Sequence, residues 1–264
     1  MGYMISQVKA GAVIEIEKWK RCSRERRREL KRSGKVNPTR EAQQKVNDER
    51  AFKKCRLLVN ENFRVGDYWL TFTFASEFKP SFDLLTEEYP KMIRKLRTLY
   101  RRVDVEFKYI SPAIDYGRRP HLHMLLPQGV ALSDIHEAWP FGRIHIKLLD
   151  ESGSYYKLAE YIFNHGGEDY RGKRWNQSKN LKTPVEKVRE VKANAWREEP
   201  AAPKGYMIDK TYPIKRGVNP INGDEYLKYA VVALPTEKKG NSRGGQARVC
   251  AGVTSNALKK GDGK

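Results

Sequence analysis

Cysteine is scarce in this sequence, and long apolar runs are missing from it. Only three cysteines, Cys22, Cys55 and Cys250, are spread over 264 residues, with no CxxC spacing. This argues against a disulfide framework and against a zinc–cysteine site, so we expect free thiols. No stretch of eighteen apolar residues occurs, and the only apolar part of the first twenty residues contains acidic side chains. The sequence therefore predicts neither a membrane span nor a secretory signal, and we expect a cytoplasmic protein with no membrane partner.

Acidic residues are also in short supply, with 32 Asp and Glu against 52 Lys and Arg, for a formal net charge of +20. An excess of this size attracts polyanions over several Debye lengths at low salt. The charge is clustered, since residues 18–35 hold ten basic and two acidic side chains. A second basic segment surrounds Trp175 and contains Arg171, Lys173, Arg174 and Lys179. Cations around a flat ring suit a single strand with exposed bases, so nucleic acid is the leading partner and a generically basic surface is the alternative.

Hydrophobic periodicity predicts alternating strands and helices between residues 67 and 166. Strands are expected at 67–75, 103–111, 121–126 and 143–149, with a further strand at 228–234. Helices are expected at 38–62, 83–102, 133–139 and 154–165. Because strands adjacent in sequence pair readily, this order predicts an α+β fold, an antiparallel sheet of about five strands with helices packed on it, related to ferredoxin-like layouts.

Composition shifts along the chain suggest four parts. We expect residues 1–37 to be a basic N-terminal arm and residues 38–185 to be the main domain. Residues 186–236 would be a C-terminal extension that packs on this domain. Residues 237–264, rich in Gly and Lys and poor in large apolar side chains, are typical of a disordered basic tail.

All five histidines fall within 45 residues, and two of them form a His-x-His unit. In a strand, residues i and i+2 point to one face, so His121 and His123 would aim two imidazoles at one point. A divalent ion needs a third ligand, and Asp115 is the nearest carboxylate that could reach the same face, with Glu106 as the weaker candidate. The alternative is that both histidines are strand residues whose ring nitrogens bond backbone carbonyls.

The last predicted helix offers a tyrosine nucleophile. Lys157, Tyr161, Asn164 and His165 share one face of it, because Tyr161 lies four residues after Lys157, three before Asn164 and four before His165. A phenol has a pKa near 10 and needs a metal ion or a cation to activate it, and Lys157 is placed for that. Periodicity alone does not choose between Tyr161 and Tyr156.

Four stretches together resemble a known family: NENFRVGDYWLTFTF, IDYGRRPHLHMLL, GRIHIKLL followed by LAEYIFN, and RWNQSKNLKTP. Over roughly residues 38–185 the chain resembles the HUH endonucleases, specifically the rolling-circle replication initiator proteins of bacterial plasmids, phages and integrated elements. In mobilisation relaxases the tyrosine precedes the histidine pair, so the order here favours a replication initiator.

The resemblance implies a metal-dependent enzyme that nicks and rejoins single-stranded DNA. His121, His123 and Asp115 would bind Mg²⁺ or Mn²⁺, which polarises the scissile phosphate. Tyr161 would attack the phosphorus, leaving a free 3′-hydroxyl and a covalent 5′-phosphotyrosine. The expected partners are single-stranded or hairpin origin DNA, contacted also by Arg118 and Arg119, and a host helicase.

One position departs from the family pattern. Many relatives carry Lys three residues after the tyrosine, where this chain has Asn164. The role of that Lys would then pass to Lys157 or to His165. Two alternatives stay open: a transposase of the same catalytic class, and a non-catalytic nucleic-acid-binding module that stacks bases on Phe72, Phe74 and Trp175.

Overall fold

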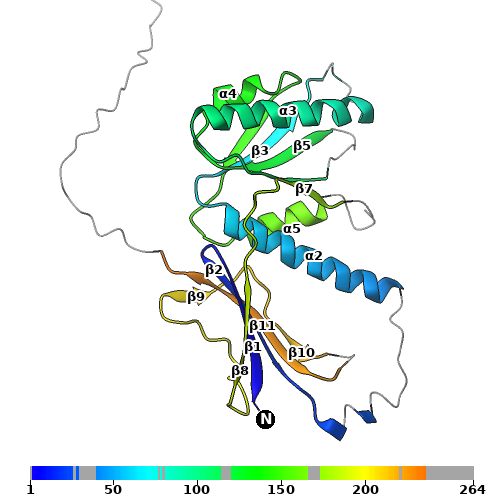
Figure 1. Cartoon of the computed structure of the whole chain (residues 1–264), viewed down its shortest axis with the longest axis vertical. Coiled ribbons are helices and arrows are strands. Elements are labelled where there is room, and N and C mark those ends of the chain that lie inside the picture. The colour runs from blue at the N-terminus through cyan, green and yellow to red at the C-terminus, as the bar shows by residue number, and fades with distance from the viewer. Residues whose placement is uncertain are drawn as a thin grey trace, which may run out of the picture. The chain divides into compact units, whose positions relative to one another are not determined.

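A computed structural model describes residues 2–25, 28–29, 40–76, 78, 81–113, 120–165, 173–219 and 222–235 (Figure 1). Met1–Leu234 form one compact unit and Pro235–Lys264 a second, of which only Pro235 is described. The tail that we expected at 237–264 therefore lies outside the described residues. The domain boundaries at 37, 185 and 236 stay predictions.

Five strands form an antiparallel sheet in the order β6-β3-β5-β4-β7. They are β3 (Tyr68–Thr73), β4 (Ile110–Pro112), β5 (His121–Leu126), β6 (Ile144–Leu148) and β7 (Trp175–Gln177). Together with the helices this confirms the predicted α+β fold with an antiparallel sheet. The strand expected at 103–111 is wrong for its first seven residues, which form no ladder. Asp104 takes a left-handed φ of 54° there, and Phe107 and Tyr109 pack against the core from an irregular segment.

Helices cover both faces of this sheet. α3 (Phe82–Arg102) and α4 (Leu132–Glu137) pack on the face formed by Leu70, Phe72, Leu122 and Met124. α2 (Arg40–Asn62) and α5 (Tyr156–Asn164) pack on the opposite face, against Ile110 and Leu125. In β3 and β5 one row of apolar side chains therefore lies under α3, while the alternate side chains face α5, because successive side chains alternate between faces.

A second antiparallel sheet has the order β10-β11-β2-β1-β8, with β9 also paired to β11 (Figure 1). Its strands are β1 (Tyr3–Ala10), β2 (Val13–Lys20), β8 (Glu186–Val191), β9 (Tyr206–Ile208), β10 (Lys215–Val218) and β11 (Glu225–Ala233). Residues 3–20 are therefore strands, and the expectation of a basic arm is wrong for them. They pair with strands about 170 to 220 residues further along the chain, as the registers Val8↔Glu186 and Ile14↔Val231 show.

A buried ion pair joins the second sheet to α2. The Arg56 side chain donates two hydrogen bonds to the Glu15 carboxylate, at 2.5 Å from Nε and 2.8 Å from Nη2. Both residues are about 95% buried. The Arg56 guanidinium also lies over the rings of Phe52, Tyr156 and Tyr212, at 4.8 to 5.4 Å from their centroids. Arg56 of α2 thus contacts both α5, through Tyr156, and the second sheet, through Glu15.

Breaking this pair should destabilise the protein strongly. Glu15→Gln should lower the free energy of unfolding by about 3–5 kcal/mol, because the guanidinium stays buried without a counter-charge. Denaturation in guanidinium chloride followed by circular dichroism measures the change. The double variant Glu15→Leu with Arg56→Met should recover most of the loss, since it buries no charge. A Glu15→Gln protein as stable as the wild type would contradict this account.

Candidate metal and tyrosine site

β5 presents His121 and His123 on one face of the first sheet. They pair with Thr73 and Thr71 of β3, in the middle of the sheet, while Leu122 between them is 1% exposed in the core under α3. His123 is buried and His121 half-buried. The alternation expected from the sequence therefore holds, and both imidazoles face the side that α5 covers.

α5 brings a tyrosine against this histidine pair. The helix packs through Ala159 and Ile162, which are fully buried. Tyr161 lies on the flank of that contact and is 43% exposed. Its hydroxyl lies 2.7 Å from Nε2 of His123, within hydrogen-bond distance. A phenol that is held by a buried ring and still reaches solvent is accessible to a large substrate.

A third imidazole completes the cluster. His165 follows the last residue of α5, four residues after Tyr161, and its ring centroid lies 4.9 Å from that of His123. One nitrogen from each of His121, His123 and His165 lies within 4.8 Å of the other two. Ligands bound to one ion at about 2.1 Å stand roughly 3–4 Å apart, so small ring rotations would close this set around a cation. The donor set therefore fits a metal ion.

Two residues of β3 hold His123 in place. The indole of Trp69 stacks on the imidazole at 5.0 Å between centroids and 8° between planes. The Thr71 hydroxyl oxygen lies 3.0 Å from Nδ1 of His123. When Nδ1 carries the proton and donates to Thr71, the lone pair is on Nε2, where Tyr161 or a metal ion can use it. We did not identify Trp69 and Thr71 from the sequence, although the alternation of β3 opposite β5 places them beside His123.

The expected carboxylate ligands are not part of the described cluster. Asp115 lies outside the described residues, as do Arg118, Arg119 and Arg171. Glu106 is described, and its carboxylate accepts a hydrogen bond of 2.9 Å from Asn180. Within the described residues the three histidines are the group that could hold a metal ion, and Glu106 is not part of it.

The structure separates the two tyrosines that periodicity left equivalent. Tyr156 is buried and meets Phe52 edge-on at 5.4 Å, beneath the Arg56 guanidinium. Burial raises the pKa of the Tyr156 phenol. Tyr156 therefore anchors α5, and Tyr161 is the tyrosine beside the histidines.

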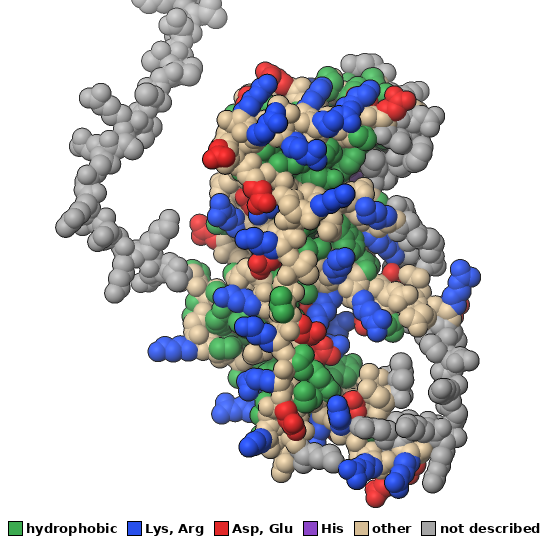
Figure 2. All heavy atoms as spheres, viewed as in Figure 1, with side chains coloured by type: hydrophobic (Ala, Val, Ile, Leu, Met, Phe, Trp, Pro, Cys, Tyr) green, Lys and Arg blue, Asp and Glu red, His purple; other side chains and the backbone are tan. Residues whose placement is uncertain are grey.

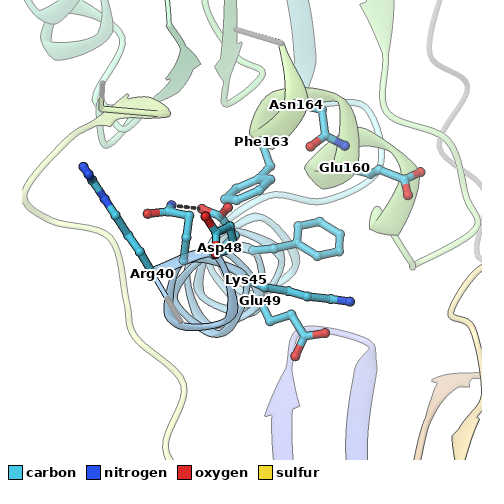
Figure 3. A pocket seen from close by; sticks show the side chains of 10 residues that line it. Arg40, Lys45, Asp48, Glu49, Glu160, Phe163 and Asn164 are labelled. Atoms are coloured by element: carbon cyan, nitrogen blue, oxygen red, sulfur yellow. Dashed lines mark hydrogen bonds between the residues drawn. The ribbon is translucent and has the colours of Figure 1, made fainter. Parts of the chain in front are cut away.

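Lys157 and Asn164 lie near the two ends of α5 and line different hollows. Lys157 pairs with Glu160 at 3.1 Å and lines a cavity of about 320 Å³ together with Trp69 and Tyr161. Asn164 lines a groove of about 830 Å³ between α2 and α5, beside Phe163 and Glu160 (Figure 3). Of the residues that we expected on one face, Lys157 shares its cavity with Tyr161, whereas Asn164 lines the other hollow.

The basic segment around Trp175 partly serves packing. Arg174 pairs with Asp48 at 3.7 Å and lies 4.8 Å over the Phe163 ring, and Trp175 is half-buried and donates to Gln177. Lys173 and Lys179 are exposed. Arg174 and Trp175 thus support the end of α5.

The base-stacking role considered for the first sheet is wrong at Phe72. Phe72 is fully buried under α3, and its ring meets Trp139 edge-on at 5.3 Å. Phe74 packs against the same tryptophan at 5.1 Å. Neither ring therefore has an open face on which a base could stack. This weakens the hypothesis that the protein is a non-catalytic nucleic-acid-binding module.

An antiparallel sheet with three clustered imidazoles facing a helical tyrosine defines a candidate phosphoryl-transfer site. A family model described as replication-associated protein ORF2/G2P matches residues 67–165, from β3 to the third histidine. Over these residues the chain is similar to replication-associated proteins. No curated protein and no solved structure matches the chain. Among the described residues, no helix has the length and apolar character needed to cross a membrane.

Proposed function

We propose that this protein is a replication initiator that nicks and rejoins single-stranded origin DNA through a covalent tyrosine intermediate. The observation that carries the proposal is the 2.7 Å contact between the Tyr161 hydroxyl and His123, inside a cluster of three histidines. The family match over residues 67–165 supports the same role. Single-stranded or hairpin DNA is the proposed substrate, and a host helicase remains a predicted partner.

In the cleavage step, the Tyr161 oxygen forms a bond to phosphorus as the bond from phosphorus to the 3′-oxygen breaks. The phenol proton leaves to water, and the 3′-oxygen takes up a proton. The products are a 5′-phosphotyrosine and a free 3′-hydroxyl that can prime synthesis. Because the new ester keeps the energy of the broken one, the reverse attack by a 3′-hydroxyl rejoins the strand without ATP.

His121, His123 and His165 would hold the metal ion for this reaction. A bound divalent ion would polarise the scissile phosphate and offset its charge. Imidazole nitrogens favour transition metals, whereas Mg²⁺ prefers oxygen ligands. Of the two ions that we expected, Mn²⁺ therefore fits the described residues better. His165, which we considered as a substitute for the family lysine, would then act as a metal ligand.

An adduct assay tests the proposal. Purified protein, Mn²⁺ and single-stranded oligonucleotides that tile the origin should yield a protein–DNA adduct that survives boiling in detergent. EDTA should abolish the adduct, and a second oligonucleotide with a free 3′-hydroxyl should release it by rejoining. Absence of any adduct across the tiled origin, with Mn²⁺ present, would contradict the proposed function.

A further inference from the structure

The outer face of α3 carries a dense row of cations. Between Tyr89 and Val103 the helix contains six basic residues and no acidic one: Lys91, Arg94, Lys95, Arg97, Arg101 and Arg102. In Figure 2 blue side chains gather over the part of the molecule where Figure 1 places α3. We call these six residues the α3 ridge.

The inner face of α3 fixes the direction of the ridge. Met92, Leu96 and Tyr100 are at most 3% exposed in the core of the first sheet. At 100° per residue, the six cations fall on the opposite arc of the helix. The buried row leaves the helix no freedom to rotate, so the cations are held outward as a rigid surface.

The ridge is poorly neutralised by its surroundings. Lys91 pairs with Glu88 at 2.6 Å, but no ion pair within 4.0 Å involves Arg94, Lys95, Arg101 or Arg102 in the described part of the chain. Carboxylates only flank the ridge, with Asp134 and Glu137 beside it on α4 and Asp104 and Glu106 near its end.

Like charges four residues apart destabilise a helix, and Lys91–Lys95 and Arg97–Arg101 are such pairs. The helix dipole favours Arg101 and Arg102 in the last turn, but it offers nothing to Lys91, Arg94 and Lys95 further from the C-terminus. A bound polyanion would remove this repulsion. The charge pattern therefore points to a partner rather than to the stability of α3.

The ridge suits a double helix better than a single strand. Proteins hold single strands by stacking bases on exposed rings, whereas duplex phosphates need only cations. The tyrosines of α3 point inward: Tyr100 is fully buried and donates to the Pro127 carbonyl, and Tyr89 packs on the core. The twelve residues from Lys91 to Arg102 span about 18 Å, which is the length of roughly five duplex base-pair steps.

We propose that the α3 ridge binds the phosphate backbone of double-stranded DNA. It lies on the face of the first sheet opposite to Tyr161 and the three histidines, so the two surfaces can hold different parts of one substrate at once. The choice of DNA as the polyanion rests on the proposed function. The preference for a duplex rests on α3 alone, and phosphate contacts carry no sequence information.

Charge reversal tests this proposal without relying on catalysis. Arg94→Glu with Arg101→Glu should weaken binding of a 20-base-pair DNA duplex at least about tenfold and lower the salt slope by about two. Affinity for a 20-nucleotide single strand should change less than about twofold. The matched control is Lys187→Glu with Arg189→Glu on exposed β8, which makes the same change in net charge. Fluorescence anisotropy between 100 and 300 mM salt gives both quantities, and circular dichroism checks the fold.

Each outcome has a distinct meaning. Duplex binding lost in the α3 variant and kept in the control supports the ridge. An equal loss of duplex affinity in the α3 variant and the control would overturn the proposal, as would a loss of single-strand affinity as large as the loss of duplex affinity in the α3 variant. Either result would mean that net charge alone determines binding. If Glu substitution disturbs α3, Arg94→Gln with Arg101→Gln should still lower duplex affinity about threefold to tenfold. An absent adduct in the wild-type protein would refute the proposed function and leave these duplex measurements valid.

Discussion

Tyr161→Phe should reduce the covalent protein–DNA adduct by at least about 10⁴-fold, since it removes the oxygen that would bond to phosphorus in the proposed step. The fold should be unchanged, because Tyr161 is 43% exposed and phenylalanine keeps its ring. Denaturing gels with a labelled oligonucleotide measure the adduct, and mass spectrometry of the digested adduct identifies the modified peptide.

Tyr156→Phe is the matched control for this experiment. It makes the same chemical change five residues earlier on α5, in a ring that packs under Arg56 away from the histidines. The Tyr156→Phe protein should form adduct within about threefold of the wild type, as expected for a hydroxyl remote from the reacting atoms. Adduct formation that survives in Tyr161→Phe and disappears in Tyr156→Phe would reverse the assignment of the nucleophile.

His165→Ala should lower the affinity for Mn²⁺ by about 10²-fold or more, since even residues that only orient metal ligands contribute 10- to 100-fold. Cleavage at limiting Mn²⁺ should fall in parallel, while metal-free binding of single-stranded DNA should stay within about twofold because phosphate contacts dominate it. Isothermal titration with Mn²⁺ measures the affinity directly. His136→Ala, on α4 under the opposite face of the sheet, should titrate like the wild type.

Asp115→Asn, measured in the same Mn²⁺ titration, distinguishes between the two candidate sets of metal ligands. The sequence points to His121, His123 and Asp115, whereas the described residues bring His165 to the pair. If Asp115→Asn loses Mn²⁺ and His165→Ala keeps it, the cluster of three imidazoles is not the metal site. If both lose it, the ion has a mixed set of nitrogen and oxygen ligands.

The main domain was predictable because its signals are local. The strands at β3, β5 and β6 and the helices α3 and α5 follow from period-two and period-3.6 patterns within single segments. The His-x-His geometry follows from the same alternation. The choice of Tyr161 over Tyr156 does not follow from periodicity, because both residues lie near the edge of the apolar stripe of the helix. Only the packing of Tyr156 against Arg56 distinguishes them.

Apart from β11, which matches the strand expected at 228–234, the strands of the second sheet were not predicted because they depend on contacts between distant parts of the chain. In β2 the buried face includes Glu15, which breaks the expected alternation of apolar and polar residues, and the residue that neutralises it is 41 positions away. β8 is exposed along nearly its whole length and resembles a charged loop in sequence. Similarly, His165 joins His121 only after a helix has folded back over the sheet, so spacing along the chain gives no sign of it.

The order of strands in the second sheet has a consequence for how the protein is made. β2 lies between β1 and β11, and β11 is the last of the described strands to leave the ribosome. During synthesis the edge of β2 that pairs with β11 stays unpaired while more than 200 residues are added. Because an unpaired edge invites other strands, chains that stop short of residue 225 should aggregate even though every residue of the tyrosine and histidine site is already present.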